Sequence, residues 1–223
     1  MGGQISLKAS DGHRLGGYRA DPEVTPKGGV VVIQEIFGVN RSIRAACDRL
    51  ARHGYSAVAP ALFDRSEPGF ESGYSPQEVA KARSFIARPD WDAMLRDANA
   101  AKEALAPSGP VGIIGFCLGG TIAYLAATRL SGLSAAVGYY GGQIVRFVEE
   151  PERCPVQLHF GEKDEHIPQS DVGVVRARHP KIEIYTYPAE HAFANEDRPS
   201  YHEPSARLAW ERTLKFLDAH MRP

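Results

Sequence analysis

A cysteine set among closely spaced glycines is the residue of this chain with the clearest capacity for chemistry. Cys117 lies in the segment GFCLGG at residues 115–120, directly after an apolar run and directly before a helical pattern. This is the nucleophile-elbow pattern G-x-S-x-G with cysteine in place of serine. Glycines let a strand and a helix approach closely, and the start of the helix favours an anionic sulfur. The motif predicts a thiolate nucleophile; a buried structural cysteine in a glycine-rich turn is the alternative.

Two later residues supply the groups that a nucleophilic thiol needs. Asp164 follows the apolar run 156–160, and His191 follows the run 182–187. The order nucleophile, acid, histidine is the one that α/β-hydrolases use. In this interpretation His191 takes or holds the thiol proton of Cys117 and returns a proton to the leaving oxygen. Asp164 then accepts a hydrogen bond from the other ring nitrogen and fixes the tautomer.

Two backbone N–H groups are candidates for the oxyanion hole. The first belongs to Leu118, the residue after the nucleophile. The second is expected from the loop after the run 30–33, where Ile36 is the candidate. Glu35 in the same loop is expected to face the elbow and to control ionisation of the thiol. A solvated loop carboxylate is the alternative for Glu35.

The elements that must position these residues alternate between strand and helix patterns from about residue 29 onward. Strands are predicted at residues 30–33, 56–62, 111–116, 135–140, 156–160 and 182–187. Helices are predicted at residues 43–53, twice across 76–105, and at 119–130, 168–178 and 204–220. Continuous apolar strands alternating with helices predict an α/β fold, a mostly parallel central sheet with helices on both faces. Short strands at 5–7 and 15–18 flank Asp11-Gly12 and predict an antiparallel hairpin at the N-terminal edge.

Length and composition fit one domain over residues 1–223, since α/β folds often run to about 200–250 residues as one unit. A formal net charge of −1 provides no electrostatic footprint for nucleic acid. No apolar run approaches the roughly 20 residues that span a bilayer, and no leader segment is expected. Three cysteines in unlike contexts favour a reducing, cytoplasmic location without disulfides, and no histidine spacing indicates a metal site. The expected partner is a small molecule, and the expected assembly is a monomer or weak homodimer.

The chain resembles the dienelactone hydrolase (carboxymethylenebutenolidase) family over nearly its whole length. The resemblance rests on six blocks, namely residues 34–38, 59–63, 115–120, 137–141, 161–164 and 191–193. It implies an α/β-hydrolase fold without metal or cofactor, and a Cys117–Asp164–His191 triad assisted by Glu35. It also implies ester or lactone hydrolysis through a thioester acyl-enzyme at Cys117.

The same resemblance suggests how substrate is held. Arg65 is expected to clamp a substrate carboxylate, and Phe37 is a further substrate-binding candidate. Tyr139 and Tyr140 end a predicted strand that faces the same mouth, so they are candidates for lining the pocket; packing in the core is the alternative for at least one of them. An exposed loop arginine is the alternative for Arg65. The family pattern for dienelactone reads His-Ser-Phe-x-Arg after the catalytic histidine, whereas this chain has Ala192 and Asn195 at the two polar anchors. A related lactone or ester is therefore at least as good a candidate substrate as dienelactone.

Two other functions use a comparable cysteine. Glutamine amidotransferase domains carry a similar turn but follow it with a His-x-Glu pair, whereas His191 is followed two residues later by Phe193. A non-catalytic sensor would capture an electrophile or oxidant at Cys117 once and then stop. Repeated turnover of an ester distinguishes the hydrolase from the sensor.

Overall fold

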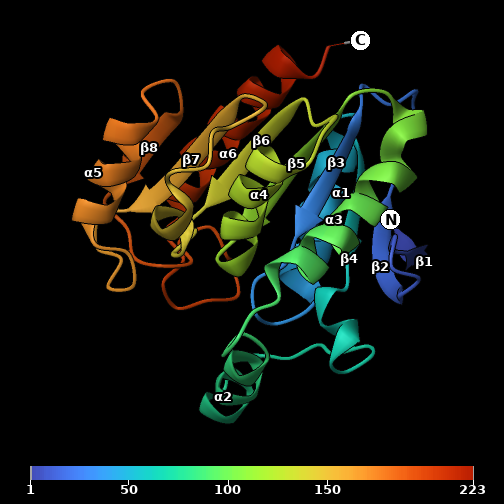
Figure 1. The fold of residues 1–223 in the computed structure, drawn as a ribbon, viewed down its shortest axis with the longest axis horizontal. Helices are drawn as coiled ribbons and strands as arrows, with labels where there is room; N and C mark the ends of the chain where they lie inside the picture. Colours follow the sequence, from blue (N-terminus) through green and yellow to red (C-terminus); the bar gives the residue numbers. More distant parts are fainter. Residues whose placement is uncertain (1, 223) are drawn as a thin grey trace. The chain divides into compact units, whose positions relative to one another are not determined.

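Eight β-strands and six α-helices follow one another along residues 2–222, the part of the chain that the computed structural model describes (Figure 1). Contacts between Cα atoms group them into two compact units, one up to Gly112 and the other from Ile113 to Arg222. Strand β5 (Val111–Phe116) crosses this boundary along the chain. The expectation of a single domain therefore stays a prediction, and each unit is described by itself.

Parallel and antiparallel pairing both occur in the first unit, where the strands follow the order β1-β2-β4-β3. Their bounds are β1 (Gly3–Lys8), β2 (Arg14–Ala20), β3 (Gly29–Ile33) and β4 (Ser56–Pro60). β3 pairs in parallel with β4, whereas β1 with β2 and β2 with β4 are antiparallel. Every residue of β3 and β4 is buried, as continuous apolar strands require. The predicted N-terminal hairpin is confirmed, and Gly12 takes a φ of 89° in its turn.

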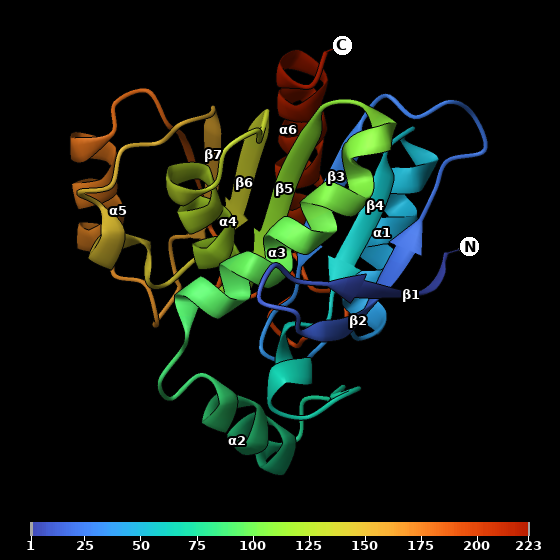
Figure 2. The same ribbon diagram turned by 45° about the vertical axis from the view of Figure 1, so that its right-hand side comes forward.

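Helices cover both faces of this first sheet. α1 (Arg41–Arg52) and α3 (Trp91–Leu105) both pack on β3 and β4, and Figures 1 and 2 show them on opposite sides. The side chain of Asn40 caps α1 by accepting the N–H of Ile43, and Gly54 follows the helix with a φ of 90°. The remaining elements are α2 (Pro76–Phe85) and the 3₁₀ turns η1 (Leu62–Arg65) and η2 (Ala106–Ser108).

The second unit carries the strands β5-β6-β7-β8 in that order. The bounds of the last three are β6 (Ala135–Tyr139), β7 (Val156–Gly161) and β8 (Glu183–Tyr187), which pair in parallel. Its helices are α4 (Leu118–Arg129), α5 (Gln169–Arg178) and α6 (Glu203–His220), with a 3₁₀ turn η3 (Ile144–Phe147). α4 and α6 pack on β6 from opposite sides (Figures 1 and 2). The mostly parallel α/β class that was predicted is confirmed.

Membrane-spanning helices and metal-binding clusters are both absent from the described residues. None of the helices within residues 2–222 combines the length and the apolar character needed to cross a membrane. In the same range, no three His, Cys, Asp or Glu side chains are grouped so that they could hold a metal ion.

Candidate active site

The turn between β5 and α4 is as sharp as the glycine pattern predicts. Cys117 takes φ 55° and ψ −113°, a region that L-residues rarely adopt. A Cβ on Gly115 would collide with the carbonyl of Gly119, and one on Gly120 would collide with the carbonyl oxygen of Tyr139. The two glycines thus allow the backbones to approach more closely than any side chain would permit, and the backbone strain falls on Cys117.

Cys117 lies where the N-terminus of α4 meets the end of β6. Cys117 is half-buried and precedes the first residue of α4, so the N-terminal end of the helix dipole lies at its own backbone. The Cys117 N–H donates to the carbonyl of Tyr139 at 3.0 Å, which ties the elbow to the end of β6. A helix N-terminus stabilises an anionic sulfur over a neutral one.

Asp164 and His191 meet as the sequence predicts. Nδ1 of His191 donates to Oδ2 of Asp164 at 2.7 Å, and the carboxylate is fully buried. The other oxygen, Oδ1, accepts the backbone N–H of His166 at 2.8 Å. Asp164 follows β7 and His191 follows β8, so neighbouring parallel strands present both side chains at their carboxyl ends.

Cys117 and Asp164 both act on the imidazole of His191 and favour its protonated form. Burial by itself lowers the pKa of His191. The hydrogen bonds to Asp164 and Cys117, with the charges of both, outweigh burial and raise the pKa to about 10. An imidazolium is the form of His191 that this environment favours at neutral pH.

Backbone strain gathers at the same place. Among residues 2–222, positive φ outside glycine occurs at Cys117, at Tyr140 with φ 39°, and at Ala192 with φ 62°. The first carries the thiol, the second packs its ring 5.0 Å from that of His191, and the third directly follows His191. Strained residues persist where the surrounding structure holds them and are concentrated at functional sites.

Tyr139, which is expected to bind substrate, has its side chain in the core of the second unit. Its side chain is 1% exposed, its hydroxyl is 2.7 Å from Oγ1 of Thr213 on α6, and its ring lies 4.5 Å from that of His159. His159 is itself fully buried, which lowers its pKa to about 3 and keeps it neutral. These contacts are those of a core residue, and the expected substrate contact of Tyr139 stays a prediction.

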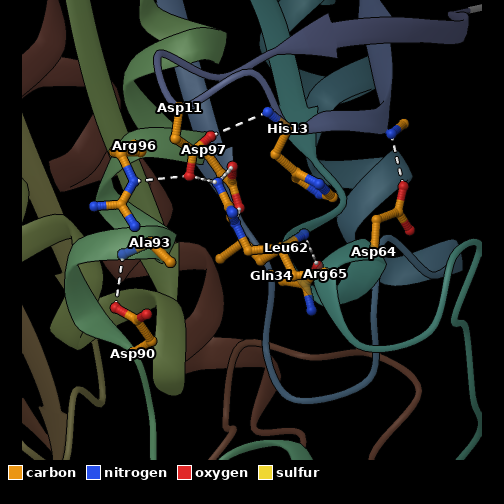
Figure 3. Close-up of polar contacts among 11 residues, drawn as sticks. Asp11, His13, Gln34, Leu62, Asp64, Arg65, Asp90, Ala93, Arg96 and Asp97 are labelled. Carbon is orange, nitrogen blue, oxygen red and sulfur yellow. Dashed lines mark hydrogen bonds and ion pairs between the residues drawn. The ribbon is translucent and has the colours of Figure 1, made fainter.

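Arg65 binds carboxylates of the protein itself (Figure 3). Its Nε and Nη2 donate to the two oxygens of buried Asp97, each at 2.8 Å, and Nη2 lies 2.9 Å from Oδ2 of Asp11. Arg96 reaches the same Asp11 oxygen at 3.0 Å. Asp97 therefore occupies the Nε–Nη2 edge of the guanidinium, and the expected clamp on a substrate carboxylate stays a prediction.

The loop after β3 holds the other predicted residues, and all three are buried. Glu35 is 4% exposed, Ile36 7% and Phe37 4%. The ring of Phe37 packs edge-on against Tyr74 at 4.7 Å. Gln34 anchors the loop to η1, since its Oε1 accepts the N–H of Leu62 at 3.1 Å (Figure 3). The roles of these residues toward Cys117 stay predictions.

Sequence reasoning missed two neighbours of His191. The ring of Tyr140 lies 5.0 Å from that of His191, and the ring of His166 lies 5.2 Å from it. The doubled tyrosine before Gly141 and Gly142 was the one visible signal, since glycines mark a turn at the end of β6. The tertiary structure shows that it is the ring of Tyr140 that lies against His191.

Comparison with known proteins finds relatives that match almost the whole chain. The sequence pattern of the dienelactone hydrolase family matches residues 15–221. Carboxymethylenebutenolidase from Pseudomonas putida is 33% identical over 226 residues, covering 96% of this chain and 94% of that protein. Carboxymethylenebutenolidase 1 from Cupriavidus pinatubonensis is 30% identical, covering 96% and 95%.

Solved structures show the same fold. A candidate dienelactone hydrolase from Klebsiella pneumoniae superposes with a TM-score of 0.86 at 32% identity, over 98% of each chain. The Pyrococcus furiosus esterase Pf2001 has a TM-score of 0.74 at 14% identity and covers 99% of this chain and 93% of its own. At that identity the second likeness concerns the fold alone, which is that of the α/β-hydrolases.

Proposed function

The chain belongs to the dienelactone hydrolase family and is a hydrolase of that kind, and we propose that it hydrolyses a small lactone or ester through Cys117. The observation that carries the proposal is the hydrogen bond of His191 to buried Asp164, together with the strained Cys117 elbow, whose thiol acts on the same imidazole. A nucleophile, a base and an orienting acid in contact are what covalent acyl transfer requires.

Acylation begins with the Cys117 thiolate facing the His191 imidazolium. The sulfur adds to the carbonyl carbon of the substrate, and the carbonyl oxygen becomes an oxyanion. When that oxyanion collapses, the bond to the leaving oxygen breaks, and His191 gives its proton to this oxygen. The products are a thioester on Cys117 and an alcohol, which in a lactone stays attached to the acyl group.

Deacylation uses the same residues in reverse. Neutral His191 takes a proton from water while the water oxygen adds to the thioester carbonyl. The carbon–sulfur bond then breaks, the thiolate leaves, and the imidazolium faces it again. Asp164 stabilises the imidazolium at both stages without accepting its proton. The net reaction consumes one ester bond and one water and yields an acid and an alcohol.

Backbone donors are proposed for the oxyanion. The Leu118 N–H is in the first turn of α4, where helix N–H groups have no partner within the helix. The Ile36 N–H is the proposed second donor, and Glu35 is proposed to restrain the thiol until substrate arrives. Removing one oxyanion donor typically costs on the order of 10²–10³-fold in kcat.

The acyl group is proposed to lack a free carboxylate. Arg65 is already paired with Asp97 and Asp11. Asn195 is neutral and buried, and its Oδ1 accepts the N–H of Asp197. Neutral lactones and esters fit this charge balance better than the anionic lactone that the relatives' name implies.

The decisive experiment replaces the nucleophile. We expect Cys117→Ala to abolish turnover of p-nitrophenyl acetate with an unchanged circular dichroism spectrum, while Cys154→Ala remains active. Iodoacetamide should label Cys117 alone, because burial raises the pKa of the Cys47 thiol and raises that of Cys154 to about 11. Wild-type rates in the Cys117→Ala variant would refute the proposal, and a single equivalent of product followed by arrest would identify a sensor.

A further inference from the structure

Tyr140 is the buried, strained residue of the second unit that the proposed reaction leaves without a role. It follows β6 directly, is 0% exposed and takes a φ of 39°. Its N–H donates to the carbonyl of His159 at 2.7 Å, so its backbone continues the pairing of β6 with β7. The strain is therefore held by regular sheet bonds and is not the looseness of a surface turn.

The ring of Tyr140 touches the catalytic turn at two points. It lies 5.0 Å from the ring of His191 at an interplanar angle of 59°, and 5.5 Å from that of Phe193 at 71°. Ala192, between these two residues, takes a φ of 62° and is buried. Two strained residues thus belong to one packing arrangement, with one ring against both neighbours of Ala192.

We propose that Tyr140 is a positioning residue for His191, whose ring fixes the tilt of the imidazole between Asp164 and Cys117. The inference rests on the proposed function and specifies how that site is held. One hydrogen bond from Nδ1 to Asp164 leaves the imidazole free to tilt about the bond, and a buried ring against its face removes this freedom.

Core packing alone does not explain the position. Tyr139, one residue earlier, already fills the core with its hydroxyl bonded to Thr213. A positive φ outside glycine costs on the order of 1–3 kcal/mol, and glycine occupies the next two positions, 141 and 142. A tyrosine at the strained position is thus explained by what its side chain contacts.

The test distinguishes the effect of the Tyr140 ring on kcat from the effect of its hydroxyl and from a general loss of stability. We expect Tyr140→Phe to keep most of the wild-type kcat, and Tyr140→Leu to fall 10- to 100-fold below the Phe variant with KM changed less than threefold. A displacement of about 1 Å at a reacting group costs roughly 10²-fold. Tyr124→Leu is the matched control, since Tyr124 is equally buried in the same unit but contacts His179. It should lose stability and keep its kcat per folded molecule.

A second readout does not depend on any substrate. In Tyr140→Leu, alkylation of Cys117 by iodoacetamide should shift to higher pH, because a tilted imidazolium no longer stabilises the thiolate. Tyr140→Phe should not shift it. Should Tyr140→Leu fail to fold, Phe193→Leu removes the ring that braces Tyr140 and should lower kcat at least threefold with the same alkylation shift.

Three results would overturn the inference. The first is an unchanged kcat and alkylation profile in Tyr140→Leu. The second is the same result in Phe193→Leu, if that variant replaces Tyr140→Leu. The third is an equal loss of kcat in Tyr140→Phe and Tyr140→Leu. Absence of turnover in the wild type is a different result, since it would refute the proposed hydrolysis. The alkylation profile would still test the positioning of His191.

Discussion

The imidazole of His191 is held between a buried carboxylate and a thiol. Burial opposes its charge, but the hydrogen bonds and charges of Asp164 and Cys117 raise its pKa to about 10. A histidine whose folded pKa is raised contributes stability that is fully present below its unfolded pKa of about 6.5. This contribution is lost as the pH rises through about 10. At the residue scale, the stability that His191 contributes and the imidazolium form that the proposed mechanism needs are therefore both lost as the pH rises through about 10.

Replacing the orienting acid tests this assignment. We expect Asp164→Asn to lower kcat/KM on the order of 10³-fold, because the imidazolium loses its charged partner and its fixed tautomer. The alkaline limb of the pH–rate profile should move to lower pH. Glu165→Gln, an exposed neighbouring carboxylate, is the matched control and should leave the profile unchanged. An unmoved alkaline limb in Asp164→Asn would contradict the assignment.

Arg65 has two separable expected effects. Arg65→Ala leaves Asp97 buried and unpaired, so the free energy of unfolding should fall by about 3 kcal/mol in urea titrations. The exposed pair Arg207–Glu211 provides the control, and Arg207→Ala should change stability by less than about 1 kcal/mol.

The catalytic effect of the same variant is measured on matched esters with and without a carboxylate. Because Arg65 is already paired, the ratio of their kcat/KM values should be the same in Arg65→Ala as in the wild type. A loss confined to the carboxylate-bearing ester would restore the clamp that the sequence suggested.

At the scale of elements, the nucleophile depends on how closely α4 approaches the end of β6. Gly120 has no room for a Cβ, because the carbonyl oxygen of Tyr139 and the backbone of Gly141 lie against it. The same carbonyl of Tyr139 accepts the N–H of Cys117. A side chain at position 120 would therefore separate the two elements that define the elbow.

We accordingly expect Gly120→Ala to lower both the free energy of unfolding, by on the order of 2 kcal/mol, and kcat. Gly173 on α5 is the matched control, since a Cβ there meets nothing within 4 Å. Gly173→Ala should stabilise the protein by about 0.4–1 kcal/mol and leave kcat unchanged. Chemical denaturation and initial rates measure both quantities. Equal behaviour of the two variants would show that the close approach is unimportant.

At the scale of the whole molecule, the open question is whether the two compact units fold as one. Trp91 lies on α3 in the first unit and Trp210 on α6 in the second, so each unit carries its own fluorescent reporter. We propose one cooperative domain over residues 1–223. Trp91→Phe and Trp210→Phe should then show coincident urea midpoints for the remaining tryptophan and for circular dichroism, after allowance for each variant's stability. Separate fluorescence and dichroism transitions within one variant would establish two domains.

Much of the fold was predictable because its signals are local. The five strands that are buried at every residue, the hairpin at Asp11-Gly12 and the helix end at Gly54 depend on residues that are close in sequence. The predicted helix at 119–130 is observed at Leu118–Arg129, a shift of one residue at each end. The Asp164–His191 contact was also predictable, because neighbouring parallel strands end at the same edge of a sheet.

The sequence by itself determined the α/β class and the glycine turn at Cys117, and it selected the three residues that we propose as reacting groups, since glycine spacing and strand order restrict where such groups can lie. The tertiary structure decided which ring meets His191 and which carboxylates hold Arg65. Tyr139 and Tyr140 are identical in type, yet Tyr139 bonds Thr213 and Tyr140 packs on His191. Asp97 and Asp11 reach Arg65 from segments 32 and 54 residues away in sequence, a pairing that no local pattern encodes.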